Sequence, residues 1–534
     1  MTTYSSLFTQ PVSQSEQAHP KQVPNHGGGY SFKISPEQQF LRFLILGSEG
    51  GTAYASPKKL TKDNATNAIA FMRANPEDSM GLLVSVSVSG RAHKNDAAIF
   101  ALALAITLPE TKQLAISSIP VVCRTGTHLF QFVTTLKALG VGWGRSLKRG
   151  VANWYTTKDT DQLIYQVTKY RQREGMSHRD VLRLCHAESG TLNPVFRWIV
   201  AGEDGCGTRN IGKRQYDKVL LDEKLFAFEE LQNTYDSNLA VQLIQKYRFT
   251  HEMVPNHFLR NTEVWEALLE HIPYTALLRN IGRLGSIGML YPFSPGAKIV
   301  SNMLSNRDAL LASRVHPLSV YLALKTYSSG HGLKGDLSWN VNPKIVDVLE
   351  NAFADSFDTV TPTNKNTMLA VDISGSMWSS HIANTKISAA EAAAVLVALA
   401  AKTEPNYLVG GFHSNWMPLE IQRDTPFRNV LKIMEKHSVP EWTNCSLPMN
   451  YALNNKIPVE VFQLYTDNDT NFGRIHPYVA LEDFRSKMGI PAKLAVVAMT
   501  ATECSIANPE DAGMLDFVGF DTATPSLIAD FSQS

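Results

Sequence analysis

Short continuous apolar runs alternate with helix-period segments from residue 367 to the end of the chain. The short runs predict buried strands, because a strand covered on both faces has apolar residues at successive positions. The predicted strands are Met368–Ile373, Tyr407–Phe412, Val461–Thr466, Leu494–Met499 and Phe517–Phe520. The alanine-rich Ile387–Thr403 predicts a helix, and Thr524 begins a last one. We therefore assign residues 367–534 to an α/β domain with a doubly wound, Rossmann-like parallel sheet.

From about residue 31 to 355 the apolar residues recur with the helical period instead, and short Gly, Pro, Ser or Asn breaks separate the periodic stretches. The predicted helices are Phe40–Leu46, Thr66–Arg73, Ala97–Thr107, Leu129–Leu139, Asp161–Arg173, Arg179–His186, Val264–His271, Tyr274–Leu284 and Pro317–Tyr327. Leu82–Val88 is the main exception, because its pattern also fits a short strand. Helices joined by short loops favour an all-α domain of stacked pairs, as in HEAT-type solenoids.

Two segments of different composition divide the chain. Residues 1–30 contain Ser, Gln and Pro and end in Gly27–Gly29, which predicts a disordered leader. The threonine-containing stretch before Asn366 predicts a linker. The predicted organisation is a leader over 1–30, a helical-repeat domain over 31–355, a linker over 356–366 and the α/β domain over 367–534.

An apolar content of 44% in 534 residues is ordinary for a globular protein of several domains. The N-terminus lacks the basic start and apolar core of a signal peptide, and no apolar run is long enough to span a bilayer. The five cysteines are scattered and lack metal-ligand spacing, which favours reduced thiols. We expect a cytoplasmic protein without membrane contact, and also a nuclear one if the host is eukaryotic.

The net charge of +1 hides an asymmetry between the two parts of the chain. Residues 367–534 carry 11 Lys and Arg against 18 Asp and Glu, a net charge of −7, which leaves +8 for residues 1–366. A basic helical part favours a polyanion as its partner.

Asp372, Ser374 and Ser376 directly follow the first predicted strand of the α/β domain. In open α/β sheets, ligands bind at the carboxyl ends of strands. One carboxylate and two hydroxyls supply the oxygen ligands that Mg²⁺ prefers. An acid and serines after a strand also serve as helix caps, so these three residues alone leave both interpretations open.

A cation-rich stretch lies between residues 169 and 186 and predicts two helices. Gly175 ends the first helix, and Ser177 with Asp180 forms a capping box that begins the second. A second basic cluster, Trp143–Arg149, precedes this stretch.

Helical spacing places the cations of this stretch on two stripes, because residues three or four apart share a helix face. The stripes consist of Lys169 and Arg173 on the first helix and Arg179, Arg183 and His186 on the second, with Arg171 beside the first pair. Phosphates bind such donor-rich surfaces, so these six residues are candidate ligands of a phosphate-bearing polyanion. A solvated helix face would show the same spacing, and His186 alone fits a structural role as well.

Two further residues extend the motif at Asp372. Asp-x-Ser-x-Ser, followed by Thr443 and then by the strand-end Asp467, resembles the metal-ion-dependent adhesion site of von Willebrand factor A domains. This resemblance implies that Asp372, Ser374, Ser376, Thr443 and Asp467 hold one divalent cation, Mg²⁺, directly or through water.

The chain as a whole resembles the Ro autoantigen family, in which a TROVE domain precedes a von Willebrand A domain. The matching stretches are Arg42–Thr52, Cys123–Phe130, Trp143–Arg145, Val167–Tyr170, Thr275–Asn280, His316–Pro317, Tyr465–Asn468, Met514–Asp516 and Gly519–Asp521. They follow the family's order over nearly the whole chain.

The family resemblance implies a fold and a function. HEAT-like repeats would close into a ring that the A domain joins, in a monomer without catalytic activity. Small Y-type noncoding RNAs would bind the outer surface, and single-stranded 3′ ends of misfolded RNAs would enter the central hole. The family's Y RNA ligands correspond to Lys169, Arg173 and His186, and an exoribonuclease is a possible partner by analogy.

The sequence departs from the family pattern near the metal ligand Thr443, where Glu441-Trp442-Thr443-Asn444 replaces the frequent Gly-Gly-Thr-Asp. A different function therefore stays open, namely a Mg²⁺-dependent adaptor that binds proteins through the A domain, with RNA binding incidental. An enzyme is disfavoured, because the chain lacks the motifs of phosphate-binding loops, zinc proteases and serine hydrolases.

Overall fold

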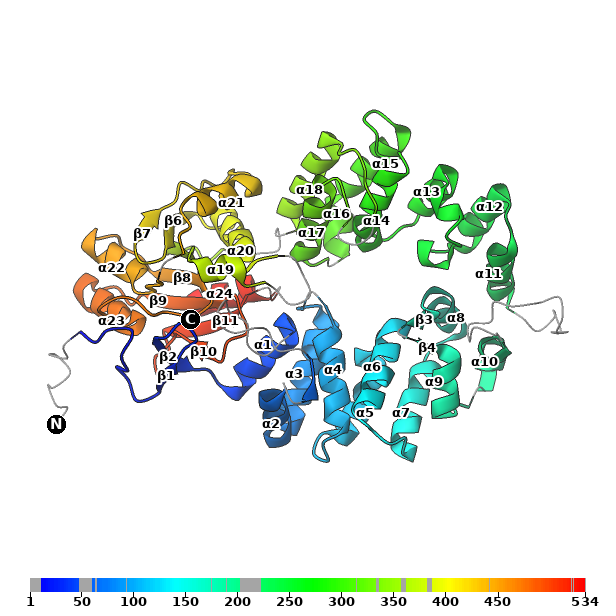
Figure 1. Cartoon of the computed structure of the whole chain (residues 1–534), viewed down its shortest axis with the longest axis horizontal. Coiled ribbons are helices and arrows are strands. Elements are labelled where there is room, and N and C mark those ends of the chain that lie inside the picture. The colour runs from blue at the N-terminus through cyan, green and yellow to red at the C-terminus, as the bar shows by residue number, and fades with distance from the viewer. Residues whose placement is uncertain are drawn as a thin grey trace. The chain divides into compact units, whose positions relative to one another are not determined.

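The computed structural model describes residues 11–47, 60–62, 65–92, 94–173, 175–188, 190–201, 222–313, 315–332, 336–356, 362–381, 387–440, 442–519, 521 and 523–533. The chain forms two compact units; Figure 1 colours the chain by residue number. The sheet unit combines Met1–Phe71 with Thr359–Ser534, and the helical unit is Met72–Asp358. Residues 202–221 lie outside the described residues.

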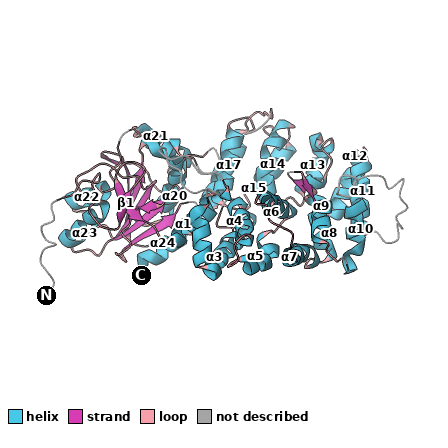
Figure 2. Cartoon of the chain, turned by 60° about the horizontal axis from the view of Figure 1, so that its bottom comes forward, coloured by secondary structure: helices cyan, strands magenta, loops and turns pink. Residues whose placement is uncertain are grey.

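The helical unit consists almost entirely of helices, as Figure 2 shows in cyan. After α2 (Thr66–Ala74), which ends inside it, these are α3 (Pro76–Ser89), α4 (Asp96–Ile106), α5 (Lys112–Val122), α6 (Gly126–Ala138), α7 (Arg145–Thr156), α8 (Thr160–Lys169), α9 (His178–Cys185), α10 (Asn193–Ala201), α11 (Glu223–Asn233), α12 (Ser237–Tyr247), α13 (Thr262–Leu269), α14 (Tyr274–Ser286), α15 (Pro295–Leu304), α16 (Arg307–Ala312), α17 (Pro317–Ser328) and α18 (Pro343–Asp355). A hairpin of β3 (Gln172–Arg173) and β4 (Met176–Ser177) interrupts them.

Packing in this unit is sequential: α4 contacts α5 and α6, α5 contacts α7, α11 contacts α12, and α17 contacts α18. Contacts between near neighbours in the chain are typical of solenoids, so the prediction of stacked helices is confirmed. The strand considered at Leu82–Val88 is wrong, because these residues belong to α3, which begins at Pro76. Proline suits the first helical position, where no intrahelical N–H bond is lost.

The sheet unit contains a six-stranded sheet in the order β11-β9-β8-β5-β6-β7. Its strands are β5 (Asn366–Asp372), β6 (Asn406–Phe412), β7 (Trp416–Pro418), β8 (Val461–Thr466), β9 (Lys493–Ala498) and β11 (Met514–Val518). Its helices are α19 (Gly375–Ser379), α20 (Ala389–Thr403), α21 (Phe427–Lys436), α22 (Leu447–Asn454), α23 (Pro477–Met488) and α24 (Thr524–Gln533). The five predicted strands are all present and parallel to their neighbours, and the edge strand β7, which the sequence did not predict, is antiparallel.

Both faces of this sheet are covered, as a doubly wound fold requires. Phe462 and Leu464 of β8 belong to a core with α22 and α23, whereas Tyr465 lies against α20 and α24. The chain runs from β5 to β6 on one side and returns to β8 on the other, so the strand order reverses between β5 and β8. Ligands of open α/β sheets bind at such a switch point.

The prediction of a disordered leader is wrong for residues 11–30. β1 (Gln22–Pro24) pairs with β2 (Tyr30–Lys33), and β2 pairs with β10 (Cys504–Ser505) of the α/β domain. Phe32 is buried in the α/β core, 5.4 Å from the ring of Tyr478. This segment gains its order from contacts with residues more than 400 positions away, which its composition does not reveal.

α1 (Pro36–Leu46) also belongs to the sheet unit, so the helical unit does not begin near residue 31 as predicted. Arg42 of α1 is 1% exposed, and its Nη2 donates to both carboxylate oxygens of Asp516 at 2.6 Å. Its Nη1 donates to the backbone oxygens of Thr502 and Cys504. This buried ion pair joins α1 to β11.

Four cysteines, Cys123, Cys185, Cys445 and Cys504, are buried free thiols, and Cys206 lies outside the described residues. No helix within the described ranges combines the length and the apolar character needed to cross a membrane.

Candidate functional site

Asp372 ends β5 at the switch point of the sheet and is fully buried. Its Oδ1 accepts hydrogen bonds from the backbone N–H and the hydroxyl of Ser374, at 3.0 and 2.6 Å. Its Oδ2 accepts one from Thr466 Oγ1 at 2.8 Å. The hydroxyl of Ser376 lies 3.0 Å from that of Ser374. One carboxylate and two hydroxyls are thus gathered at one strand end.

Asp467 follows β8, the strand next to β5, and is also fully buried. Its Oδ1 accepts the backbone N–H of Asp469 at 3.1 Å, whereas its Oδ2 is buried without a hydrogen-bond partner in the described structure. Burial raises the pKa of Asp467, and burial followed by the charge of Asp467 raises the pKa of Asp372. Two adjacent buried carboxyls with one unpaired oxygen favour a bound cation.

Thr443 lies on a loop beside the loop that follows Asp467. Hydrogen bonds hold these two loops together. The N–H of Thr443 donates to Asn471 Oδ1 at 2.9 Å, and its carbonyl accepts the N–H groups of Asn471 and Phe472, both at 3.0 Å. The structure therefore gathers Asp372, Ser374, Ser376 and Asp467 at one edge of the sheet, and it holds the backbone of Thr443 against the loop that follows Asp467.

The chemistry of this donor set fits a hard cation. The described residues contain no group of three or more His, Cys, Asp or Glu that could hold a metal ion. A cation at Asp372 and Asp467 would therefore rely on the hydroxyls of Ser374, Ser376 and Thr443. Oxygen-only donors suit Mg²⁺ and disfavour zinc, which usually binds nitrogen and sulfur.

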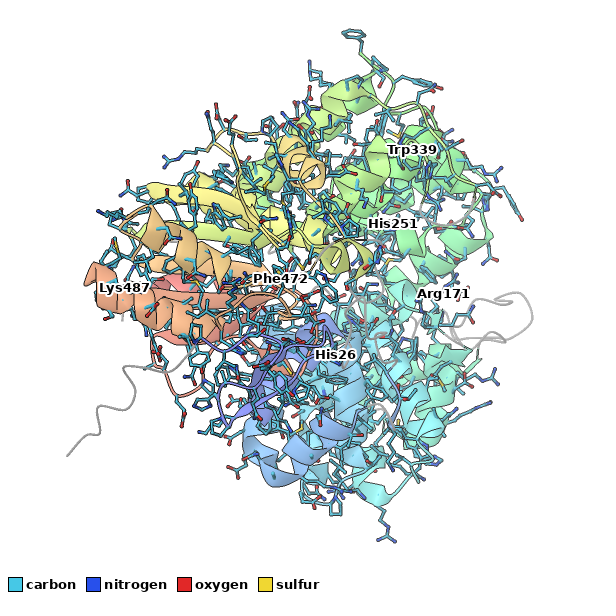
Figure 3. All side chains as sticks on the ribbon, turned by 60° about the vertical axis from the view of Figure 1, so that its left-hand side comes forward. His26, Arg171, His251, Trp339, Phe472 and Lys487 are labelled. Carbon is cyan, nitrogen blue, oxygen red and sulfur yellow. The ribbon has the colours of Figure 1, made fainter. Side chains whose placement is uncertain are left out.

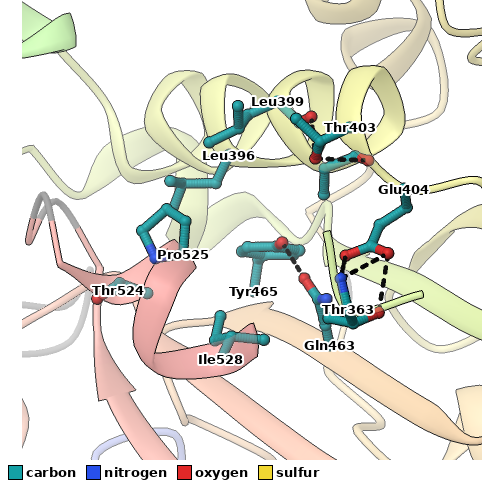
Figure 4. A pocket seen from close by; sticks show the side chains of 11 residues that line it. Thr363, Leu396, Leu399, Thr403, Glu404, Gln463, Tyr465, Thr524, Pro525 and Ile528 are labelled. Atoms are coloured by element: carbon teal, nitrogen blue, oxygen red, sulfur yellow. Dashed lines mark hydrogen bonds between the residues drawn. The ribbon is translucent and has the colours of Figure 1, made fainter. Parts of the chain in front are cut away.

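A small cavity lies between α20, α24 and the face of β8 that points away from α22 and α23 (Figure 4). Its volume is about 30 Å³, enough for only one or two water molecules. Glu404 at its rim is satisfied by the N–H and hydroxyl of Thr363, and Tyr465 donates to Gln463 Oε1 at 2.8 Å. This cavity is too small to be a ligand site.

The second candidate site, in the helical unit, differs from the predicted pair of stripes. Lys169 and Arg173 do not share a helix face, because α8 ends at Lys169 and Arg173 lies on β3. His186 is not in a helix either, because it caps α9 in the left-handed conformation, with φ 51°. The capping box of Ser177 and Asp180 is present as predicted.

Lys169 and Arg171, two of the six predicted RNA ligands, contact later segments of the helical unit. The side chain of Lys169 is 10% exposed; its Nζ donates to Tyr165 OH at 2.8 Å and lies 3.7 Å from Glu252 Oε1. Arg171, labelled in Figure 3, donates to Gln232 Oε1 at 3.3 Å, and its guanidinium lies 5.9 Å from the Phe228 ring centre. Both cations help to hold the end of α8 against later segments of the unit.

The other four predicted ligands lie on the hairpin and on α9. Arg173, Arg183 and His186 are exposed, and Arg179 is half-buried. Arg179 and Arg183 are four positions apart on α9, as predicted. The structure therefore divides the six residues into three exposed residues, Arg173, Arg183 and His186, and three that are partly or mostly buried, Lys169, Arg171 and Arg179.

The basic cluster Trp143–Arg149 lies beside α9 in the structure, and the sequence did not indicate this contact. It forms the first turns of α7, which packs against α9. Arg145 and Arg149 are exposed, and the charge of Lys148 acts on the pKa of Cys185, the last residue of α9. We define the basic surface as Arg145, Lys148, Arg149, Arg173, Arg183 and His186.

Family models match both parts of the chain. The model of the TROVE domain matches residues 23–201 and 209–365, and that of the Ro60 vWA domain matches residues 366–532. The TROVE match begins inside the predicted leader, and the boundary near residue 365 lies at the end of the predicted linker.

Full-length relatives are similar to the chain. The RNA-binding protein RO60 of Deinococcus radiodurans is 37% identical over 533 residues, which cover 97% of either chain. That of Caenorhabditis elegans is 34% identical over 592 residues, which cover 97% of this chain and 91% of the relative. The crystal structure of the Deinococcus radiodurans RO (RSR) protein matches with a TM-score of 0.70 and 36% identity, over 93% of this chain and 99% of that chain.

Proposed function

The chain belongs to the family of Ro60 proteins with a TROVE domain and a vWA domain, and on this basis we propose that it binds RNA as a scaffold without catalytic activity. Two relatives that align with almost the whole length of this chain carry the name RNA-binding protein. Family membership makes RNA the expected ligand of the helical unit.

The observation that carries the proposal is the basic surface itself. The exposed basic residues lie on α9 and on two elements that pack against it, α7 and the β3–β4 hairpin. Arginine and protonated histidine donate charge-assisted hydrogen bonds to phosphate oxygens, and such contacts depend little on sequence. Structured RNA would dock on this surface through its backbone and shape.

The finer proposal concerns which RNAs bind. We expect small structured noncoding RNAs of the Y type on the basic surface, and single-stranded 3′ ends of misfolded RNAs in a hole enclosed by the helical repeats. Such a protein would act in RNA quality control as a monomeric ribonucleoprotein core, with an exoribonuclease as a candidate partner.

The test of RNA binding is fluorescence anisotropy with the full chain. A hairpin RNA with a single-stranded 3′ tail is expected to bind, and its affinity is expected to fall at least about tenfold between roughly 50 and 200 mM salt, because phosphate contacts release counterions. A blunt hairpin and a single-stranded DNA of the tail sequence are the matched probes. Equal, salt-independent binding of all three probes would contradict the proposal.

We further propose that Asp372, Ser374, Ser376, Thr443 and Asp467 hold one Mg²⁺ ion. The ion would neutralise the two buried carboxyls and offer an open coordination position to an oxygen ligand. The support is the buried Asp467 Oδ2, which has no hydrogen-bond partner among the described residues, together with the adjacent hydroxyls of Ser374 and Ser376 beside Asp372.

Asp372→Ala is expected to weaken Mg²⁺ or Mn²⁺ binding at least tenfold while leaving RNA affinity nearly unchanged, because it removes a ligand carboxylate far in sequence from the basic surface. Calorimetric titration of the full chain measures the first effect and anisotropy the second. Asp424→Ala, which removes an exposed carboxylate of the same unit, is the control. Equal cation affinity in the Asp372 variant and the parent would refute the ligand assignment.

A second function, a Mg²⁺-dependent adaptor for proteins, is favoured by two exposed aromatic side chains. Trp442 is 61% and Phe472 45% exposed, and they flank Thr443 on the two joined loops; Figure 3 labels Phe472. Aromatic side chains are enriched at protein interfaces. This function predicts tight Mg²⁺-dependent protein partners and weak, nonselective RNA binding, which the anisotropy series would reveal.

A further inference from the structure

The N-terminal segment lies against both loops of the candidate metal site. We call residues 13–31 the N-terminal strap; Figure 1 shows it in blue beside C-terminal elements of the sheet unit. The metal loops are the one that begins at Thr443 and the one from Asp467 to His476. The following inference rests on the proposed Mg²⁺ site.

Gln14 bridges the two metal loops with one side chain. It is fully buried, although the residues around it in the strap are partly or largely exposed. Its Nε2 donates to Asn444 Oδ1 at 2.8 Å and to the carbonyl of Ile475 at 2.7 Å, and its Oε1 accepts the hydroxyl of Thr470. Asn444 follows the ligand Thr443, and Thr470 lies three positions after the ligand Asp467.

A second group of strap residues fixes the loop after Asp467. Asn25 Nδ2 donates to the carbonyl of Thr470 at 2.7 Å, and Ser31 Oγ donates to the carbonyl of Asn468 at 3.2 Å. Gly29 approaches this loop so closely that a Cβ would lie 2.0 Å from the Thr470 oxygen. The need for this close approach explains a glycine at position 29.

The metal loops themselves contain almost no regular secondary structure, so their conformation depends on the hydrogen bonds that join them to each other and on those from the strap. We propose that the N-terminal strap, through Gln14 and Asn25, positions Thr443 and Asp467 for cation binding, so that strap docking and cation binding stabilise each other. Linkage of this kind is reciprocal: whatever weakens strap docking must weaken cation binding, and the cation must strengthen docking.

Gln14→Ala is expected to weaken Mg²⁺ binding by about tenfold, the usual effect of losing a residue that orients metal ligands. Gln17→Ala is the matched control, because Gln17 is exposed and, among the described residues, donates only within the strap, to the carbonyls of His19, Pro20 and Gln22. Calorimetric titration of the full-length variants with Mg²⁺ measures the effect. If the parent and Gln14→Ala bind Mg²⁺ equally well, the result contradicts the role of the strap but still supports the proposed metal site.

Hydrogen exchange of the unsubstituted chain tests the reciprocal effect and does not depend on how a variant folds. Saturating Mg²⁺ is expected to slow amide exchange in residues 13–31, including Tyr30, whose N–H donates to the Gln14 carbonyl at 3.0 Å. Exchange in the strap that is the same with and without bound Mg²⁺ would overturn the inference. Absence of any Mg²⁺ binding by the parent would instead overturn the proposed metal site together with it.

Discussion

Replacing Arg42 by methionine is expected to lower the free energy of unfolding of the sheet unit by about 3–5 kcal/mol. Arg42 Nη2 donates to both carboxylate oxygens of Asp516, and the two side chains of this ion pair are 1% and 4% exposed. Methionine keeps much of the buried volume but leaves the Asp516 carboxylate without its partner. An uncompensated buried charge is among the most destabilising changes that one substitution can make.

Urea unfolding of the full chain, read by hydrogen exchange at β11, measures this loss in the sheet unit. The double variant Arg42→Met/Asp516→Leu is expected to recover most of it, because no charge is then left buried. Lys432→Met removes an exposed cation of the same unit and is expected to change stability by less than about 0.5 kcal/mol. A single Arg42 variant as stable as the Lys432 control would show that the ion pair is not structural.

The second large effect is expected on RNA binding. The triple variant Arg173→Ala/Arg183→Ala/His186→Ala is expected to bind RNA at least about a hundredfold more weakly than the parent. A hydrogen bond to a charged group contributes about 1.5–3 kcal/mol, so losing two such contacts already corresponds to this factor. All three side chains are exposed, so the fold is expected to be unaffected.

α21 supplies a matched control for this variant. Lys432→Ala/Lys436→Ala/His437→Ala removes two cations and a histidine that caps the helix, as His186 caps α9. Anisotropy with the tailed hairpin RNA is expected to show parent-like affinity for this control. An equal loss in both triple variants would mean that net charge, rather than the basic surface, governs binding.

The sequence predicted the features that local chemistry determines. The strand before Asp372 and the helix after it are visible in the apolar pattern, and β5 and α20 match them closely. The capping box at Ser177 needs only residues three positions apart. The resemblance to von Willebrand A domains implied that Asp372 and Asp467 share a site, and the structure places them at the ends of the neighbouring parallel strands β5 and β8.

Other features depend on contacts between residues far apart in the chain. No Gly or Pro marks the end of α8 at Lys169, and the chain leaves the helix there to form the β3–β4 hairpin. The composition of the N-terminal strap resembles that of a disordered segment, yet Gln14 and Asn25 are buried by residues beyond position 443. Likewise, only the structure shows that Lys169 faces Glu252, and that α7 adds cations to the surface of α9.

The most direct test of RNA binding in the cell is to purify the protein from its native host and to sequence the RNA that copurifies. The triple variant Arg173→Ala/Arg183→Ala/His186→Ala and the α21 control variant are purified in parallel. We expect a small set of structured noncoding RNAs to be enriched with the parent and the control and lost with the basic-surface variant. The absence of enriched RNA, or the same RNA with all three proteins, would contradict the account that this protein binds RNA through the basic surface.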